Sequence, residues 1–157
     1  MLLQYQDGET FATGVAPYTY LPASERETTP RIIISVKIQE IETSAFVDTG
    51  GVYAICSPEI AEQLELDPSE GVPVDPIQWR RERLQGVLYR IPITILAQEG
   101  VSLTIEATCF IPKLAHWQQW QSEFPCILGM YLCLDRLRFA VDPAPHNEMF
   151  HFGALNS

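Results

Sequence analysis

The residues of this chain best suited to chemistry are Asp48-Thr49-Gly50-Gly51, which directly follow the apolar run Ala45-Phe46-Val47. A carboxylate placed between a buried strand and a tight turn is held in one direction, as a general acid or base must be. Asp and Gly are also ordinary turn residues, because the carboxylate accepts backbone N–H bonds and Gly adopts positive φ. From this segment alone, Asp48 is either catalytic or a turn residue.

A second signal lies far along the chain, where Phe124-Pro125-Cys126-Ile127-Leu128-Gly129 forms a short apolar run that ends in Gly. Together the two segments resemble the retropepsin-like aspartic peptidases, in which a strand with Asp-Thr-Gly is braced by a later apolar-apolar-Gly strand. The resemblance spans residues 31–153 through the order of its parts. It implies a mainly β fold, a closed β-barrel with one or two short helices. The retropepsin-like domain would cover residues 31–157, after an N-terminal arm of residues 1–30.

The resemblance also implies a mechanism. An aspartic endopeptidase hydrolyses a peptide bond with two carboxylates that share one proton, one activating water and the other protonating the scissile carbonyl oxygen. The chain has one Asp-Thr-Gly, so the resemblance implies a homodimer in which Asp48 of each subunit faces a two-fold axis. Thr49 would then hydrogen-bond across the subunits, and Gly50 would let the backbone approach the carboxylates. Peptides or proteins are the implied substrates, and no metal or organic cofactor is implied. The remaining residues that support the catalytic loop would be Gly51, Ile127, Leu128 and Gly129.

The order of segments also places a flap, the hairpin that closes over the substrate in this family, within Ile77–Arg90. Its arginines could bind acidic side chains of a peptide or a partner, or they could form a charged, solvated hairpin edge. Those arginines are Arg80, Arg81 and Arg83. The residues that we assign to the flap itself are Arg83, Leu84, Gln85, Gly86 and Val87.

Three departures from the family pattern favour an alternative function. Gly51 stands where Ala or Ser is usual, Tyr131 stands where Asp is common, and the flap contains a single glycine, Gly86. The chain could therefore be a catalytically weak or inactive binding or scaffold module with the same fold. A second alternative is an unrelated β protein in which Asp48 is a turn residue. That alternative predicts that Ile127-Leu128-Gly129 does not pack beside the Asp48 loop.

Hydrophobic periodicity predicts the elements that would position these residues. Alternation over Ile32–Ile38, a reversal over Gln39–Glu42 and a return over Thr43–Val47 predict a hairpin that presents Asp48. A helix is expected from the N-cap Ser57 to the Asp67-Pro68 stop. Further strands are expected over residues 91–95, 103–111, 137–141 and 149–152, a helical turn over residues 130–134, and a short helix or docking surface around Trp117 and Trp120. The arm of residues 1–30 has little periodicity and could be a surface strap or part of a subunit interface.

Composition sets further limits. A chain of 157 residues with 46% hydrophobic and 19% charged residues is long enough for one core and suits a soluble, loop-rich β protein. The net charge of −10 repels polyanions, which argues against nucleic acid as a partner. No apolar run is long enough to cross a membrane, and the first residues lack the features of an export signal. Four cysteines without a Cys-x-x-Cys pair predict buried free thiols in the reducing cytoplasm and no metal site.

Overall fold

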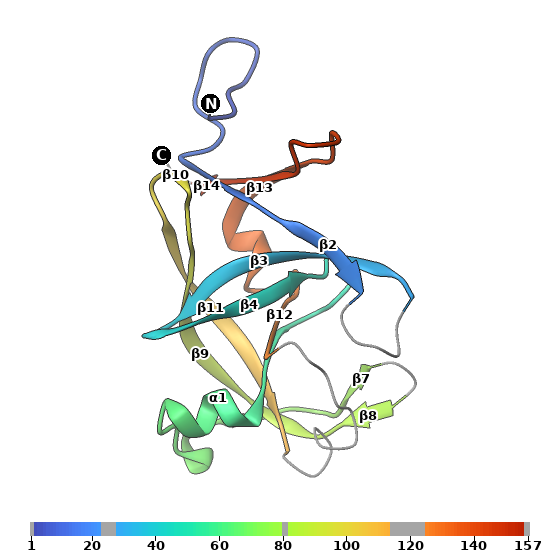
Figure 1. Cartoon of the computed structure of the whole chain (residues 1–157). Coiled ribbons are helices and arrows are strands. Elements are labelled where there is room, and N and C mark those ends of the chain that lie inside the picture. Colours follow the sequence, from blue (N-terminus) through green and yellow to red (C-terminus); the bar gives the residue numbers. More distant parts are fainter. Residues whose placement is uncertain (1, 23–27, 80–81, 114–124, 156–157) are drawn as a thin grey trace.

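A computed structural model of the chain describes residues 2–22, 28–79, 82–113 and 125–155. These residues form a mainly β structure with one short α-helix (Figure 1). The barrel strands are β3 (Pro30–Ile38), β4 (Ile41–Val47), β5 (Ala54–Cys56), β9 (Gly86–Ile95), β11 (Leu103–Pro112) and β12 (Cys126–Leu128). They are ordered β3-β4-β12-β5-β11-β9, and pairing between β3 and β9 closes the ring. The prediction of a closed β-barrel with few helices is confirmed.

A second sheet packs beside the barrel, in the order β10-β1-β14-β13. Its strands are β1 (Gly14–Pro17), β10 (Glu99–Gly100), β13 (Leu137–Asp142) and β14 (Met149–Ala154). The N-terminal residues thus contribute β1 to this sheet and β2 (Thr19–Pro22) to the edge of the barrel sheet beside β3. Both strands are only four residues long and end at proline, so they leave too little periodicity to be recognised in the sequence.

The β3–β4 hairpin places Asp48 at the exit of its second strand, as expected. Its turn is shorter than predicted, because Ile38 pairs with Ile41 and two residues, Gln39 and Glu40, make the reversal. Two-residue hairpin turns need positive φ, and Gln39 has φ 52°. The last pair of the register joins Ile32 to Val47, so the chain leaves the sheet at Asp48.

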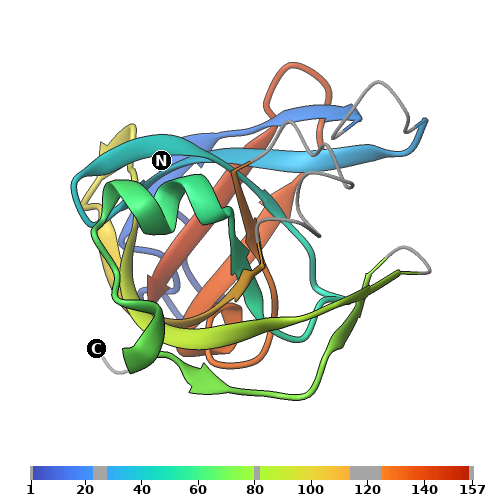
Figure 2. The ribbon, with the colours of Figure 1, turned by 90° about the horizontal axis from the view of Figure 1, so that it is seen from below.

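The helix α1 (Pro58–Gln63) begins as the sequence predicts. The Ser57 side chain accepts a hydrogen bond from the Ile60 N–H at 3.3 Å, and a proline occupies the first turn. The helix ends at Gln63, before the expected Asp67-Pro68 stop, because the chain turns through Glu65, whose φ is 55°. Figure 2 looks from below, with α1 lying across the near end of the barrel.

The remaining helices and strands of the described residues are short. They are η1 (Pro68–Glu70), β6 (Val72–Pro73), β7 (Ile77–Trp79), β8 (Glu82–Leu84) and η2 (Leu134–Arg136). The 3-10 turn η2 begins where the expected helical turn of residues 130–134 ends. The segment with Trp117 and Trp120 and the arginines Arg80 and Arg81 lie outside the described residues.

The core consists of two clusters that share the same strands. Along β4, Ala45 belongs to the larger cluster and the next residue, Phe46, to the smaller one. Successive residues of a strand point to opposite faces, so the barrel wall is buried on both sides here. We call the smaller group the outer cluster; its buried members are Ile33, Phe46, Ile55, Leu84, Phe110 and Ile127. It forms an apolar base beneath the loop that carries Asp48.

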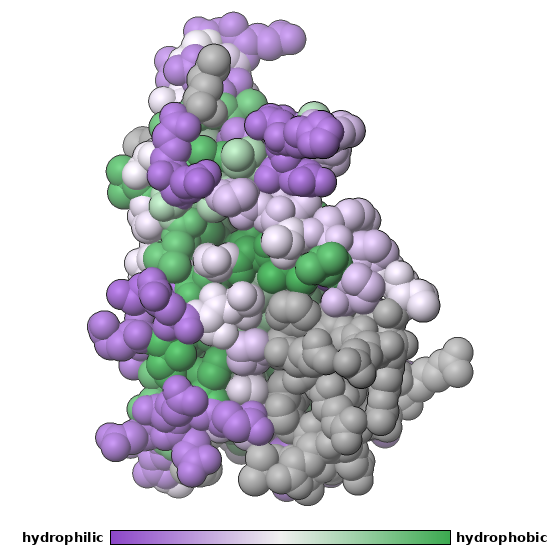
Figure 3. All heavy atoms as spheres, viewed as in Figure 1, coloured by the Kyte–Doolittle hydropathy of each residue, from purple (hydrophilic) through white to green (hydrophobic). Residues whose placement is uncertain are grey.

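The surface is mainly hydrophilic at both ends of the view in Figure 3, around α1 and around the loops at the top. Apolar side chains reach the surface between these two regions. Within the described ranges, no helix combines the length and the apolar character that a membrane crossing requires.

All four cysteines are free and buried, which confirms the prediction of buried thiols. The Cys56 and Cys126 sulfur atoms lie 3.9 Å apart on the paired strands β5 and β12. Burial raises the pKa of the Cys133 thiol from 9.0 to about 12. This thiol therefore stays protonated in the folded protein at pH values where it would ionise in the unfolded chain.

This shift predicts that the protein loses stability in alkaline solution. Between pH 9 and about 12 the unfolded chain releases the Cys133 proton and the folded chain keeps it. Cys133 alone should then lower the free energy of unfolding by about 1.4 kcal/mol for each pH unit in this window. Urea denaturation between pH 8 and 11 measures the slope. The Cys133→Ala variant should be less stable at pH 8 but should show a shallower decline. Equal slopes for the two proteins would contradict the prediction.

Candidate active site

Asp48 is the first residue after β4, and backbone groups hold it on both sides. Its N–H donates to the Leu128 carbonyl at 2.9 Å, which continues the pairing of β4 with β12. Its carbonyl accepts the Gly51 N–H at 3.0 Å, and its Oδ1 accepts the Gly50 N–H at 3.1 Å. These contacts fix the direction of the carboxylate relative to the sheet, as general acid–base chemistry requires.

The later apolar segment braces this loop. β12 lies between β4 and β5, parallel to the first and antiparallel to the second. Beyond β12, the Met130 N–H donates to the Gly51 carbonyl at 2.8 Å and the Tyr131 N–H donates to the Val52 carbonyl at 2.7 Å. A Cβ atom at Gly129 would overlap the Tyr53 carbonyl, so the two loops meet at a distance that glycine permits. Ile127-Leu128-Gly129 therefore packs beside the Asp48 loop, contrary to what the unrelated-protein alternative predicts.

Two of the departures from the family pattern, Tyr131 and Gly51, lie near Asp48. Tyr131 packs its ring against Tyr53, with the centroids 5.9 Å apart, and remains 51% exposed. A Cβ atom at Gly51 would lie 3.3 Å from Asp48 Oδ2, so Ala or Ser could occupy this position with a small adjustment. Among the described residues, none hydrogen-bonds the Thr49 hydroxyl.

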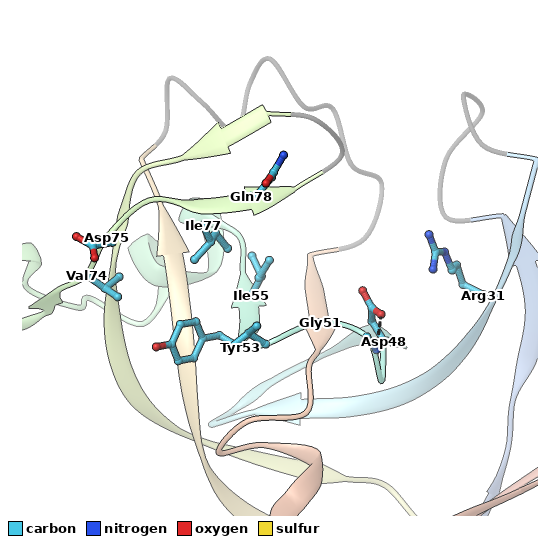
Figure 4. A pocket seen from close by; sticks show the side chains of 11 residues that line it. Arg31, Asp48, Gly51, Tyr53, Ile55, Val74, Asp75, Ile77 and Gln78 are labelled. Carbon is cyan, nitrogen blue, oxygen red and sulfur yellow. Dashed lines mark hydrogen bonds between the residues drawn. The ribbon is translucent and has the colours of Figure 1, made fainter.

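Asp48 opens into a cleft of about 680 Å³ (Figure 4). One wall is apolar and stands on the outer cluster, against which Tyr53, Val74 and Ile77 pack. In Figure 4, Arg31 lies on the other side of Asp48 from this wall. The residues that line the cleft are Arg31, Asp48, Gly50, Gly51, Val52, Tyr53, Ile55, Val74, Asp75, Ile77 and Gln78. An extended peptide crossing the cleft would meet apolar side chains, a carboxylate and a guanidinium in turn.

The hairpin β7–β8 overhangs the cleft at the position expected for a flap. Ile77 pairs with Leu84, whose buried side chain anchors the hairpin in the outer cluster. The cleft is lined by Ile77 and Gln78 of β7, the arm opposite to the one that we assigned to the flap. Of the residues assigned from the sequence, Arg83 and Leu84 lie in β8, Gln85 connects the strands, and Gly86 and Val87 begin β9.

Gly86 lies at the base of this hairpin, away from its turn. It pairs with Pro112 of β11, and a Cβ atom there would overlap the Ile111 carbonyl. The glycine therefore permits close contact between β9 and β11.

Several cleft residues were not identified from the sequence. In the sequence, Arg31 is the polar first residue of a predicted strand, and Tyr53 belongs to a predicted loop. A usable signal lies in Ala54-Ile55-Cys56, because a short apolar run without alternation indicates a strand buried on both faces. In the part of the chain that the structure describes, no three His, Cys, Asp or Glu side chains are arranged to hold a metal ion.

No protein-family model matches the sequence. No curated protein matches it either. Among solved structures, the chain is similar to a retropepsin-like aspartic protease from Rickettsia conorii, with a TM-score of 0.55 and 14% sequence identity over 90% of this chain and 95% of the other. It also matches the retroviral protease-like domain of Ddi1 from Leishmania major, with a TM-score of 0.47 and 16% identity over 81% of this chain and 97% of that domain.

The first of these likenesses covers nearly the whole of both chains. At 14% identity it establishes the fold, without extending to activity. The chain therefore has the fold of the retropepsin-like aspartic proteases.

Proposed function

We propose that this protein is an aspartic endopeptidase that hydrolyses peptide bonds with water activated by Asp48 of two subunits. The observation that carries the proposal is the position of Asp48 at the base of the cleft, held by Leu128 and Gly50 within a retropepsin-like fold. Peptides or unfolded segments of proteins are the proposed substrates. Free thiols fit a reducing compartment, so we place the enzyme in the cytoplasm.

In this proposal the second carboxylate comes from another copy of the chain, because Asp75 is the one other carboxylate among the described residues that line the cleft. Asp75 also lines the cleft, but it lies beyond Tyr53 and its carboxylate points away from Asp48 (Figure 4). A two-fold axis beside the loop would bring the two copies of Asp48 together, since such an interface uses the same surface of both subunits. Thr49 would contribute its hydroxyl across this axis, as the family resemblance implies. Among the described residues of its own subunit, that hydroxyl has no hydrogen-bond partner.

The dyad would act as a coupled acid and base. Two carboxylates about 3 Å apart cannot both be ionised cheaply, so the pair shares one proton. The ionised carboxylate removes a proton from water while the protonated one donates to the scissile carbonyl oxygen, giving a tetrahedral diol. Proton return to the leaving nitrogen then breaks the C–N bond. Gly50 would support this step by letting the backbone approach the carboxylates, and its N–H already donates to Oδ1.

The proposal predicts that activity depends on protein concentration. A monomer holds half of the dyad, so below the dissociation constant the turnover per protomer should fall in proportion to concentration. Cleavage of unfolded β-casein across a dilution series, compared with sedimentation of the same samples, measures this. Because each copy carries a charge of −10, salt should move the transition to lower concentration by screening repulsion. Constant turnover per protomer by a protein that sediments as a monomer would contradict the proposal.

A second candidate function is a binding or scaffold module with the same cleft. The hairpin favours it, because Ile77–Gln85 contains no glycine and the single Gly86 lies at the base. A monomer that binds peptides without cleaving them would support this alternative.

A further inference from the structure

The charges of the cleft are unevenly placed around Asp48. Among the described residues that line it, Arg31 is the one cation, and Asp48 and Asp75 are the carboxylates. Arg31 projects from β3 on one side of Asp48, whereas Asp75 lies far on the other side, beyond the apolar wall (Figure 4). A peptide carboxylate would therefore be repelled at the Asp75 end of the cleft and attracted at the Arg31 end.

Arg31 is held in place rather than extended into solvent. Its guanidinium carbon lies 5.6 Å from the centroid of the Phe46 ring, within the range of a cation–π contact, and the side chain is partly buried. Phe46 is itself fully buried in the outer cluster, next but one to Asp48 in the chain. A planar guanidinium carries five N–H donors, so it can bind a peptide carboxylate through two parallel hydrogen bonds while it keeps its other contacts.

We propose that Arg31 selects peptides that carry an acidic side chain beside the residue that lies over Asp48. The inference rests on the proposed function for its link to cleavage, but the recognition step requires the cleft alone. The overall charge of −10 does not oppose it, because surface carboxylates farther away than about 8 Å are largely screened at physiological salt. In a two-fold dimer, one Arg31 would lie on each side of the dyad, so the acidic residue could precede or follow the cleaved bond.

The test uses three pools of synthetic ten-residue peptides that differ at one central position, which is Glu, Gln or Lys. All other positions are random mixtures of neutral residues. Binding is measured by competition against a labelled Glu pool on the full-length Asp48→Asn protein, so that turnover does not interfere. The Glu pool should bind about tenfold more tightly than the Gln pool, and the Lys pool more weakly than both.

Variants of Arg31 in the same background separate recognition from structure. Arg31→Met keeps an unbranched apolar stem over Phe46 and should abolish the preference for Glu over Gln, whereas Arg31→Lys should retain part of it. The matched control is Arg90→Met, which removes an exposed arginine of β9 outside the cleft and should leave the preference unchanged. Equal binding of the Glu and Gln pools, or a preference that survives Arg31→Met, would overturn the inference.

Cleavage of the same pools by the unmodified protein distinguishes this inference from the proposed function. If both are right, the cleaved bonds should lie within about three residues of Glu, a separation that one extended side chain can span along a strand. Binding preference without cleavage by the unmodified protein would reject the peptidase and keep acidic recognition by Arg31. Cleavage of the Glu and Gln pools at equal rates, with equal binding, would reject acidic recognition by Arg31 and keep the peptidase.

Discussion

Under the proposed function, the Asp48→Asn variant is expected to lose peptide-bond hydrolysis by at least about a thousandfold while keeping its fold and the proposed dimer. Asn has the shape of Asp, and its amide oxygen can still accept the Gly50 N–H. It cannot take a proton from water at neutral pH, so the acid–base step fails. The ratio kcat/KM for a cleaved peptide measures the loss, and circular dichroism and sedimentation check the fold and the assembly.

Asp75→Asn is the matched control, because it removes a carboxylate from the same cleft at a distance from the dyad. It should change kcat/KM by no more than a few fold. Mixing wild-type protein with the Asp48→Asn variant tests the sharing between subunits directly. An equimolar mixture of exchanging dimers should keep about one quarter of the activity of the same total amount of wild type. Cleavage by Asp48→Asn at the wild-type rate would eliminate the dyad.

Gly129→Ala is expected to give a large loss of stability. The added Cβ would overlap the Tyr53 carbonyl and approach the Val52 carbonyl to 3.0 Å, and both are backbone atoms that cannot rotate away. Separating the two loops would stretch the bonds from Met130 to Gly51 and from Tyr131 to Val52. We expect the free energy of unfolding to fall by about 3 kcal/mol, measured by urea denaturation.

The matched control for this substitution is Gly51→Ala on the facing loop. Its Cβ would meet the Asp48 carboxylate at 3.3 Å, which a small rotation of that side chain relieves. The free energy of unfolding should change by less than about 1 kcal/mol. Equal stability of the Gly129→Ala and Gly51→Ala variants would show that the loops are not tightly apposed.

The sequence was sufficient to predict those strands in which apolar and polar residues alternate. Ile32–Ile38 and Leu103–Ile111 were predicted because polar residues mark their second face, and Ser57-Pro58 marked the helix start. The position of Asp48 followed from the first hairpin. Its brace did not follow from local pattern, because pairing between residues 46 and 127 depends on the whole barrel; family resemblance supplied that expectation.

Other parts of the fold and of the site have no local signature. Glu99-Gly100 reads as a turn, yet it forms β10 by pairing with β1, and the two polar residues fit an edge position. Arg31 enters the cleft because its strand passes Asp48 on the neighbouring side, which depends on register and on the twist of the sheet. The expected flap was placed by order along the chain, and the residues assigned to it, 83–87, do not include Ile77 and Gln78, which line the cleft.

The order of the strands has a consequence for synthesis of the protein. Val47 and Asp48 leave the ribosome long before Leu128, whose carbonyl receives the Asp48 N–H. Before that point β12, which pairs with both β4 and β5, has not been synthesised, and the loop lacks the strand that braces it. The loop that carries Asp48 is therefore complete only after the last third of the chain has been translated.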